Sequence, residues 1–60
     1  MIDGYTIQED TLDGWRDFAA YGMDEPAARD ACRWYNRRLR ARRLFRLVLR
    51  TGPHLAVIRG

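Results

Sequence analysis

The chain has 60 residues, of which 47% are hydrophobic and 12% aromatic, and its formal net charge is +3. This length allows a single domain spanning 1–60, and the apolar fraction is high enough to exclude a wholly disordered chain. A domain of this size buries only about 60% of the surface that its unfolded chain exposes. We therefore expect a monomer to be marginally stable, and a homodimer or a bound partner would bury more surface.

A reducing, soluble setting is indicated by the cysteine count and by the short apolar runs. Cys32 is the only cysteine, so no disulfide can form within the chain, whereas small secreted domains usually carry several. Apolar runs such as LAVI are far shorter than the roughly 20 residues that span a bilayer. The acidic N-terminal segment lacks the basic and apolar regions of a signal peptide. We expect a cytoplasmic protein that does not insert into membranes.

The charge is divided unevenly between the two halves of the chain. Residues 1–30 hold all eight carboxylates and two arginines, for a net −6, whereas residues 31–60 hold nine arginines and no carboxylate, for +9. There is no lysine. Arginine binds carboxylate and phosphate in a bidentate manner, so its exclusive use is compatible with anionic partners, although a GC-rich genome also favours arginine codons. Codon usage does not explain why the charge is segregated.

The first half of the chain predicts a β-hairpin. The β-branched and aromatic residues of 5–9 are typical of a strand, and Asp13-Gly14 is a turn signal that closes hairpins. A second strand is predicted at 15–21, with loose alternation. Its two expected sides are Trp15, Asp17, Ala19 and Tyr21 on one, and Arg16, Phe18 and Ala20 on the other.

A helix is predicted over 25–41. Asp24 is a good N-cap, Glu25 suits the positive end of the helix dipole, and Pro26 is tolerated only in a first turn. The apolar positions then follow the spacing i, i+4, i+7 and i+11, which is one face of a helix. These positions are Ala28, Cys32, Tyr35 and Leu39.

Two further strands are predicted at 43–51 and 54–59, separated by the Gly52-Pro53 turn. A helix continued past 41 would place Arg42 and Arg46 on or near its apolar stripe, whereas a strand aligns apolar side chains on one side. Those side chains are Phe45, Leu47 and Leu49. The order β-β-α-β-β predicts an α+β fold, in which one helix packs on one face of an antiparallel sheet. The other face is then solvated, dimerised or a binding surface.

Catalysis is not expected from the residue types present. The sequence has no serine and no lysine, and Cys32 falls on the apolar face of the predicted helix, where a thiol is usually inert packing. One cysteine and one histidine, His54, cannot complete a structural zinc site, and we do not expect them to pair. The acidic residues near the first turn match no calcium loop. We expect no metal and no cofactor.

The arginines of the predicted helix form the main candidate site. Spacings of i, i+4, i+8 and i+11 place four of them along one ridge, and like charges at i,i+4 repel. We call this set the arginine ridge: Arg29, Arg33, Arg37 and Arg40. Folding could neutralise it with the chain's own carboxylates, for which the candidates are Asp3, Glu9, Asp10, Asp13 and Asp17. Otherwise it faces an external anion.

Aromatic residues extend the candidate partner-binding set to Trp34 and Trp15. For nucleic acid, the segment WYNRRLRARR resembles the arginine-rich helices of short RNA-binding peptides, with phosphate contacts from arginine and base stacking from Trp34 or Tyr35. For protein, interfaces are enriched in Arg, Trp and Tyr, and the candidate anchors are Trp15, Tyr21 and Trp34. A small domain also needs large side chains in its core, so we expect at least one tryptophan to be buried.

The segment GWRDFAAYGMDEPAARDACRWYNRRLRARRLFRLVLR, residues 14–50, resembles small uncharacterised α/β proteins of phages, prophages and other mobile elements. That resemblance implies a protein that binds and blocks a host protein or ribonucleoprotein complex, as anti-CRISPR inhibitors do. Nucleic-acid mimics of this kind use an acidic face, which the basic second half does not fit, so the contacting face stays open. We expect a non-enzymatic protein-interaction module that acts stoichiometrically; the alternative is a nucleic-acid-binding module using the arginine-rich helix.

Overall fold

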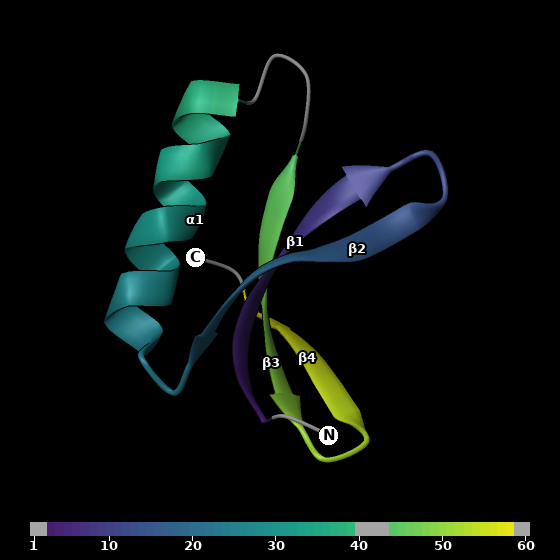
Figure 1. Cartoon of the computed structure of the whole chain (residues 1–60), viewed down its shortest axis with the longest axis vertical. Helices are drawn as coiled ribbons and strands as arrows, with labels where there is room; N and C mark the ends of the chain where they lie inside the picture. Colours follow the sequence, from purple (N-terminus) through teal and green to yellow (C-terminus); the bar gives the residue numbers. More distant parts are fainter. Residues whose placement is uncertain (1–2, 40–43, 59–60) are drawn as a thin grey trace.

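The computed structural model describes residues 3–39 and 44–58, and it has the predicted order β-β-α-β-β (Figure 1). The elements are β1 (Gly4–Thr11), β2 (Gly14–Gly22), α1 (Glu25–Leu39), β3 (Phe45–Thr51) and β4 (His54–Ile58). The predicted α+β class is therefore confirmed. The last predicted helical residues, 40–41, and the outer strand residues 43 and 59 lie outside the described residues.

The four strands form one antiparallel sheet in the order β2-β1-β3-β4. Because β2 and β3 are each antiparallel to β1, they run in the same direction, and α1 joins them across one face of the sheet (Figure 1). Within the described residues, the helix packs mainly against β1, β2 and β3, and Ile58 of β4 packs against the same core. Nowhere in 3–39 or 44–58 is a helix long and apolar enough to cross a membrane.

The start of α1 follows from its capping residue. The Ala27 amide donates to the Asp24 carboxylate (3.2 Å), and the Ala28 amide donates to the Asp24 carbonyl (3.1 Å). The first bond satisfies an amide that would otherwise have no partner in the first helical turn, and the second is the first regular hydrogen bond of the helix. Gly22, at φ 57°, supplies the left-handed turn between β2 and the helix. The predicted N-terminus of the helix is confirmed.

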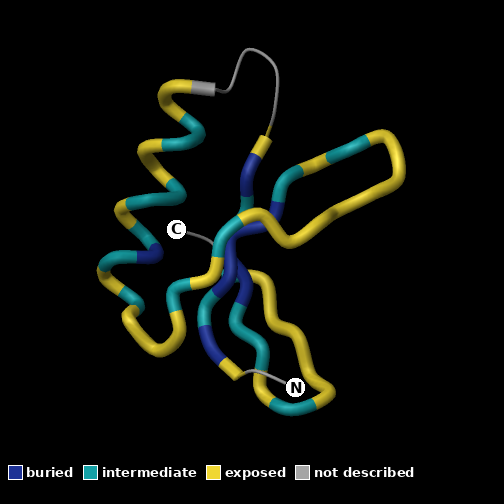
Figure 2. Tube along the Cα trace, in the orientation of Figure 1, coloured by how far each residue is buried: buried dark blue, intermediate teal, exposed yellow. Residues whose placement is uncertain are grey.

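A small core lies between α1 and the sheet (Figure 2). Its buried members are Ile7, Ala28, Phe45 and Leu47. The rings of Phe18, Tyr35 and Phe45 meet at centroid distances of 5.0–5.3 Å, which is the range of favourable aromatic pairs. The predicted inward side of β3 is thus confirmed for Phe45 and Leu47. Burial of the helix stripe is confirmed for Ala28 and partly for Cys32 and Tyr35.

The predicted sides of β2 were wrong because its pairing with β1 is irregular. Register shifts interrupt the ladder between Tyr5 and Thr6 and again between Ile7 and Gln8, and an extra residue reverses the alternation that follows it. The Phe18 ring consequently contacts Tyr35 and Phe45 on the helix side, where Ala19 and Tyr21 also pack. Trp15 and Asp17 lie on the helix-free face, with Gln8 and Arg46.

Candidate partner-binding surface

The arginine ridge on α1 begins with an arginine that the helix itself neutralises. The Arg29 guanidinium donates to the Glu25 carboxylate from Nη2 at 2.8 Å and from Nε at 2.9 Å, and both side chains are more than half buried. Glu25 lies four residues earlier, the spacing at which a glutamate and an arginine meet on a helix. From the sequence, Glu25 was expected only to suit the helix dipole, although its spacing from Arg29 already marked it as a partner. Arg29 is therefore paired within the helix.

The next ridge positions are open to solvent. Arg33 approaches Asp30 at 3.9 Å, but the two side chains are 63% and 80% exposed, and exposed pairs contribute only about 0–1 kcal/mol. Arg37 is exposed and forms no ion pair with any residue that the structure describes. Arg40 lies outside the described residues. Arg33 and Arg37 thus keep their charge available.

Trp34 lies on the same side of α1 and is half exposed, at 50%. The Arg38 guanidinium lies 5.4 Å from the centre of its ring, within the range of a cation–π contact. The edge of Tyr35 meets it from the core side, at 5.4 Å between centroids. We define the α1 outer surface as Arg33, Trp34, Arg37 and Arg38.

The second candidate tryptophan lies elsewhere. Trp15 is on β2 and 39% exposed, and its ring lies under the Arg46 guanidinium at 4.3 Å on the helix-free face of the sheet. The expectation that at least one tryptophan is buried was wrong. Both indoles rest against guanidiniums at the surface, while smaller side chains fill the core. Trp15 is therefore not a member of the α1 outer surface, although it lines one open hollow together with Arg37, Asn36, Leu44 and Phe45.

The carboxylates of the first half are largely used within the fold, away from the ridge. Asp17 accepts from Arg50 at 3.2 Å and from Gln8 at 3.0 Å, and these hydrogen bonds, Gln8 first, hold the pKa of Asp17 below its ordinary value. Asp3 accepts from the Gly52 amide at 2.7 Å. The proposed neutralisation of the ridge by Asp3 and Asp17 is therefore wrong, because the sheet places them against other partners.

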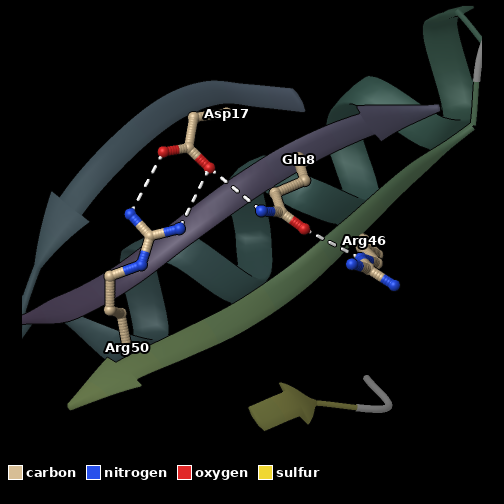
Figure 3. A network of polar contacts seen from close by, with 4 residues as sticks. All are labelled: Gln8, Asp17, Arg46 and Arg50. Atoms are coloured by element: carbon tan, nitrogen blue, oxygen red, sulfur yellow. Dashed lines mark hydrogen bonds and ion pairs between the residues drawn. The ribbon is translucent and has the colours of Figure 1, made fainter. Parts of the chain in front are cut away.

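A chain of polar contacts crosses the helix-free face (Figure 3). Gln8 on β1 accepts from Arg46 Nε at 2.9 Å and donates to Asp17, which is in turn bound by Arg50. Gln8 is only 6% exposed, so these bonds satisfy a buried amide. Arg46 and Arg50 thus help to hold β1, β2 and β3 together. Among the described arginines, those of the α1 outer surface are the group whose charge is least neutralised by the protein's own carboxylates.

Asn36 has a structural role that the sequence analysis did not detect. Its side chain donates to the Phe45 carbonyl (3.1 Å) and accepts from the Phe45 amide (2.9 Å). Phe45 precedes the part of β3 that pairs with β4 in the described residues, and the Asn36 side chain makes there both hydrogen bonds that a neighbouring strand would make. The side-chain amide of Asn36, the amide noted in the segment WYNRRLRARR, is therefore hydrogen-bonded within the protein. A helical asparagine beside the apolar stripe was the only sequence signal.

The groups with chemical reactivity are dispersed. Cys32 packs against the core, and burial raises the pKa of its thiol, while His54 lies at the exposed start of β4. Within 3–39 and 44–58, no three His, Cys, Asp or Glu side chains are grouped so that they could hold a metal ion. Comparison of the chain with protein-family models, with curated proteins and with solved structures found no match.

Proposed function

We propose that this protein is a non-enzymatic interaction module that binds an acidic surface of a partner protein stoichiometrically through the α1 outer surface. One observation carries the proposal. Arg33 and Arg37 stay exposed and weakly compensated on the helix, while Arg29, Arg46 and Arg50 are held by partners within the fold.

The composition of the α1 outer surface supports a protein contact. Trp and Arg are the residues most enriched among those that dominate binding energy at interfaces. Trp34 is half exposed, yet fixed between Arg38 and the Tyr35 edge, so little side-chain freedom remains to be lost on binding. An acidic partner would also relieve the repulsion between Arg33 and Arg37, which are one helical turn apart.

The acidic half of the chain is less suited to be the contact. A mimic of nucleic acid needs exposed, uncompensated carboxylates, whereas Asp17 is bound by Gln8 and Arg50, and Glu25 by Arg29. Asp24 caps the helix. Exposed carboxylates near the β1–β2 turn, such as Asp10 and Asp13, are few. The basic helix is therefore the better candidate for the contacting face.

Nucleic acid is the second candidate partner, and the exposure of Trp34 favours it. A half-exposed indole flanked by guanidiniums could stack on an unpaired base while the arginines contact phosphates. Such binding would weaken steeply as salt is added, because phosphate contacts release counterions. The layout resemblance to proteins of mobile elements supports a host complex in the cytoplasm as the target, and such a complex could contain protein, RNA or both.

The test is charge reversal on the helix. We expect Arg33→Glu combined with Arg37→Glu to weaken capture of the partner from lysate of the native host at least about tenfold, which corresponds to about 1.4 kcal/mol. Arg16→Glu is the control, because Arg16 is exposed on β2, away from the helix. Circular dichroism verifies that each variant is folded.

Three outcomes are informative. Loss of nuclease-resistant capture in the double variant alone would support the protein-binding proposal. Capture that disappears after nuclease treatment, together with a salt-sensitive gel shift, would favour the nucleic-acid alternative. Equal capture by the folded double variant and the wild type would contradict any contact through the α1 outer surface.

A further inference from the structure

The free edge of β4 is an apolar strand with no protecting charge. Among residues 3–39 and 44–58, β4 pairs with β3 on one side and has no neighbour on the other, and its sequence is HLAVI. Leu55 and Val57 are 42% and 51% exposed, and β4 is exposed over most of its length (Figure 2). Natural edge strands usually carry a charge, a proline or a bulge that prevents pairing with another strand. Residues 54–58 have no Asp, Glu, Lys, Arg or Pro.

The backbone groups at this edge can be assigned from their neighbours. The Asp10 amide donates to the Leu44 carbonyl on the β1 side of β3, whereas the amide and carbonyl of Phe45 face away from β1, toward Asn36. Alternation then directs the backbone groups of Leu47 and Leu49 toward their β4 partners, Ile58 and Ala56. It follows that Leu55 and Val57 direct their amides and carbonyls outward, away from the sheet.

The side chains of the same two residues lie on the helix-free face. Leu47 is a core residue on the helix side, and its β4 partner Ile58 packs against the same core. Because alternate side chains of a strand point to opposite faces, Leu55 and Val57 point away from the helix. Val57 lies opposite Val48, which is fully buried on that face. This edge thus offers outward backbone groups and apolar side chains at the same two positions.

We propose that β4 pairs with β4 of a second copy of this chain, antiparallel, with Ala56 on the two-fold axis. This register places Leu55 opposite Val57 of the other copy, so each exchanges both backbone hydrogen bonds with its partner. Their side chains form one apolar cluster beside Val48 on the helix-free face. The result is a continuous sheet across both copies.

A second copy fits this edge better than a charged segment would. Under the two-fold axis, His54 falls opposite Ile58, and residues 54–58 carry no Asp, Glu, Lys or Arg, so no like charges meet along the described strand. The edge is accessible, because α1 packs mainly on β1, β2 and β3 and Leu55 and Val57 are exposed. Only five hydrophobic residues are buried among those described. A dimer would bury further apolar surface and so stabilise a domain whose own core is small.

The geometry implies a weak, bivalent dimer. Stable interfaces bury about 600–1,000 Å² per partner, and a contact built mainly on five residues per copy falls short of that range. The two-fold axis is perpendicular to the joined sheet, so both helices lie on the same face. Two α1 outer surfaces would then be presented together, which raises the avidity for a partner that has two sites.

Sedimentation velocity and light scattering from micromolar to millimolar concentration test this proposal. We expect the mass of the wild type to rise from one chain to two, whereas Val57→Lys remains a single chain over the same range. Leu12→Lys is the matched control, because Leu12 is fully exposed at the β1–β2 turn and its variant should dimerise like the wild type. The test does not involve the α1 outer surface, so its result is separable from that of the partner-binding experiment.

Amide hydrogen exchange provides a second measurement on the unmodified chain. The amides of Leu55 and Val57 should gain protection as the concentration rises, while those of Ala56 and Ile58, already bonded to β3, should change little. A wild-type mass that stays at one chain to millimolar concentration would overturn the proposal. Dimerisation that Val57→Lys leaves intact, or protection gained along β2 in place of β4, would overturn it as well.

Discussion

The substitution Asn36→Ala tests whether a side chain of α1 takes the place of a neighbouring strand beside Phe45 of β3. It removes both hydrogen bonds to the Phe45 backbone, at 3.1 and 2.9 Å, and Phe45 is only 6% exposed. A buried backbone group without a partner costs about 1–3 kcal/mol, so the two groups together would cost about 2–6 kcal/mol. Alanine is the better helix former by roughly 0.6 kcal/mol, which leaves an expected net loss of about 1.5–5.5 kcal/mol.

That loss is large for a domain of this length, whose free energy of unfolding is expected to be about 3–9 kcal/mol. Urea unfolding followed by circular dichroism measures it, with Arg37→Ala as the control at the next, exposed helix position, where the change should stay within about 0.5 kcal/mol. Hydrogen exchange should also show the Phe45 amide exchanging faster in Asn36→Ala than in the control. A loss below about 0.5 kcal/mol with an unchanged Phe45 amide would refute the role assigned to Asn36.

Two other predictions concern the sheet. Hydrogen bonds from Gln8 and Arg50 lower the pKa of Asp17, so ionised Asp17 stabilises the fold above its ordinary pKa of 3.8, and this contribution is lost as the pH falls through the lowered native value. The free energy of unfolding, measured between about pH 4 and pH 2, should therefore fall less steeply in Asp17→Asn than in the wild type. Equal slopes would argue against this role of Asp17. Gly4 has φ 138°, and a Cβ there would lie 2.5 Å from the Gly22 carbonyl oxygen, so Gly4→Ala should lower the free energy of unfolding by about 2–4 kcal/mol. Gly14→Ala should cost less, because φ is also positive there but no atom lies within 4 Å of the added Cβ. Equal losses of the two variants in urea unfolding would contradict the steric reason.

The elements of the fold were predictable because each carries a strong local signal. Asp24 and Pro26 mark the start of the helix, Gly14 and Gly52 mark the two hairpin turns, and the apolar spacing changes from helical to alternating before Phe45. Local signals do not report the central position of β1, which depends on pairing with β3 at the far end of the chain. They also do not report the irregular pairing that reverses the sides of β2.

The candidate site was predictable only in part. Helical spacing correctly placed Arg33, Trp34 and Arg37 near one another on α1, because a regular helix fixes those relations. Arg29 is paired with Glu25, four residues earlier on the helix. Arg46 and Arg50 are bound by Gln8 and Asp17, which lie on other strands. Only the folded sheet brings Gln8 and Asp17 to Arg46 and Arg50, so no sequence spacing could have excluded those arginines.

We infer that the guanidiniums of the α1 outer surface are available to an anionic partner, while those of Arg29, Arg46 and Arg50 are not. An NMR titration of the arginine Nε–Hε signals with a short polyglutamate peptide and, separately, with a single-stranded RNA of the same length measures this availability residue by residue. We expect shifts at Arg33, Arg37 and Arg38 that saturate with the binding partner and diminish with salt, and little change at Arg29, Arg46 and Arg50. Shifts confined to Arg46 and Arg50, or none at Arg33 and Arg37 with either probe, would contradict this inference.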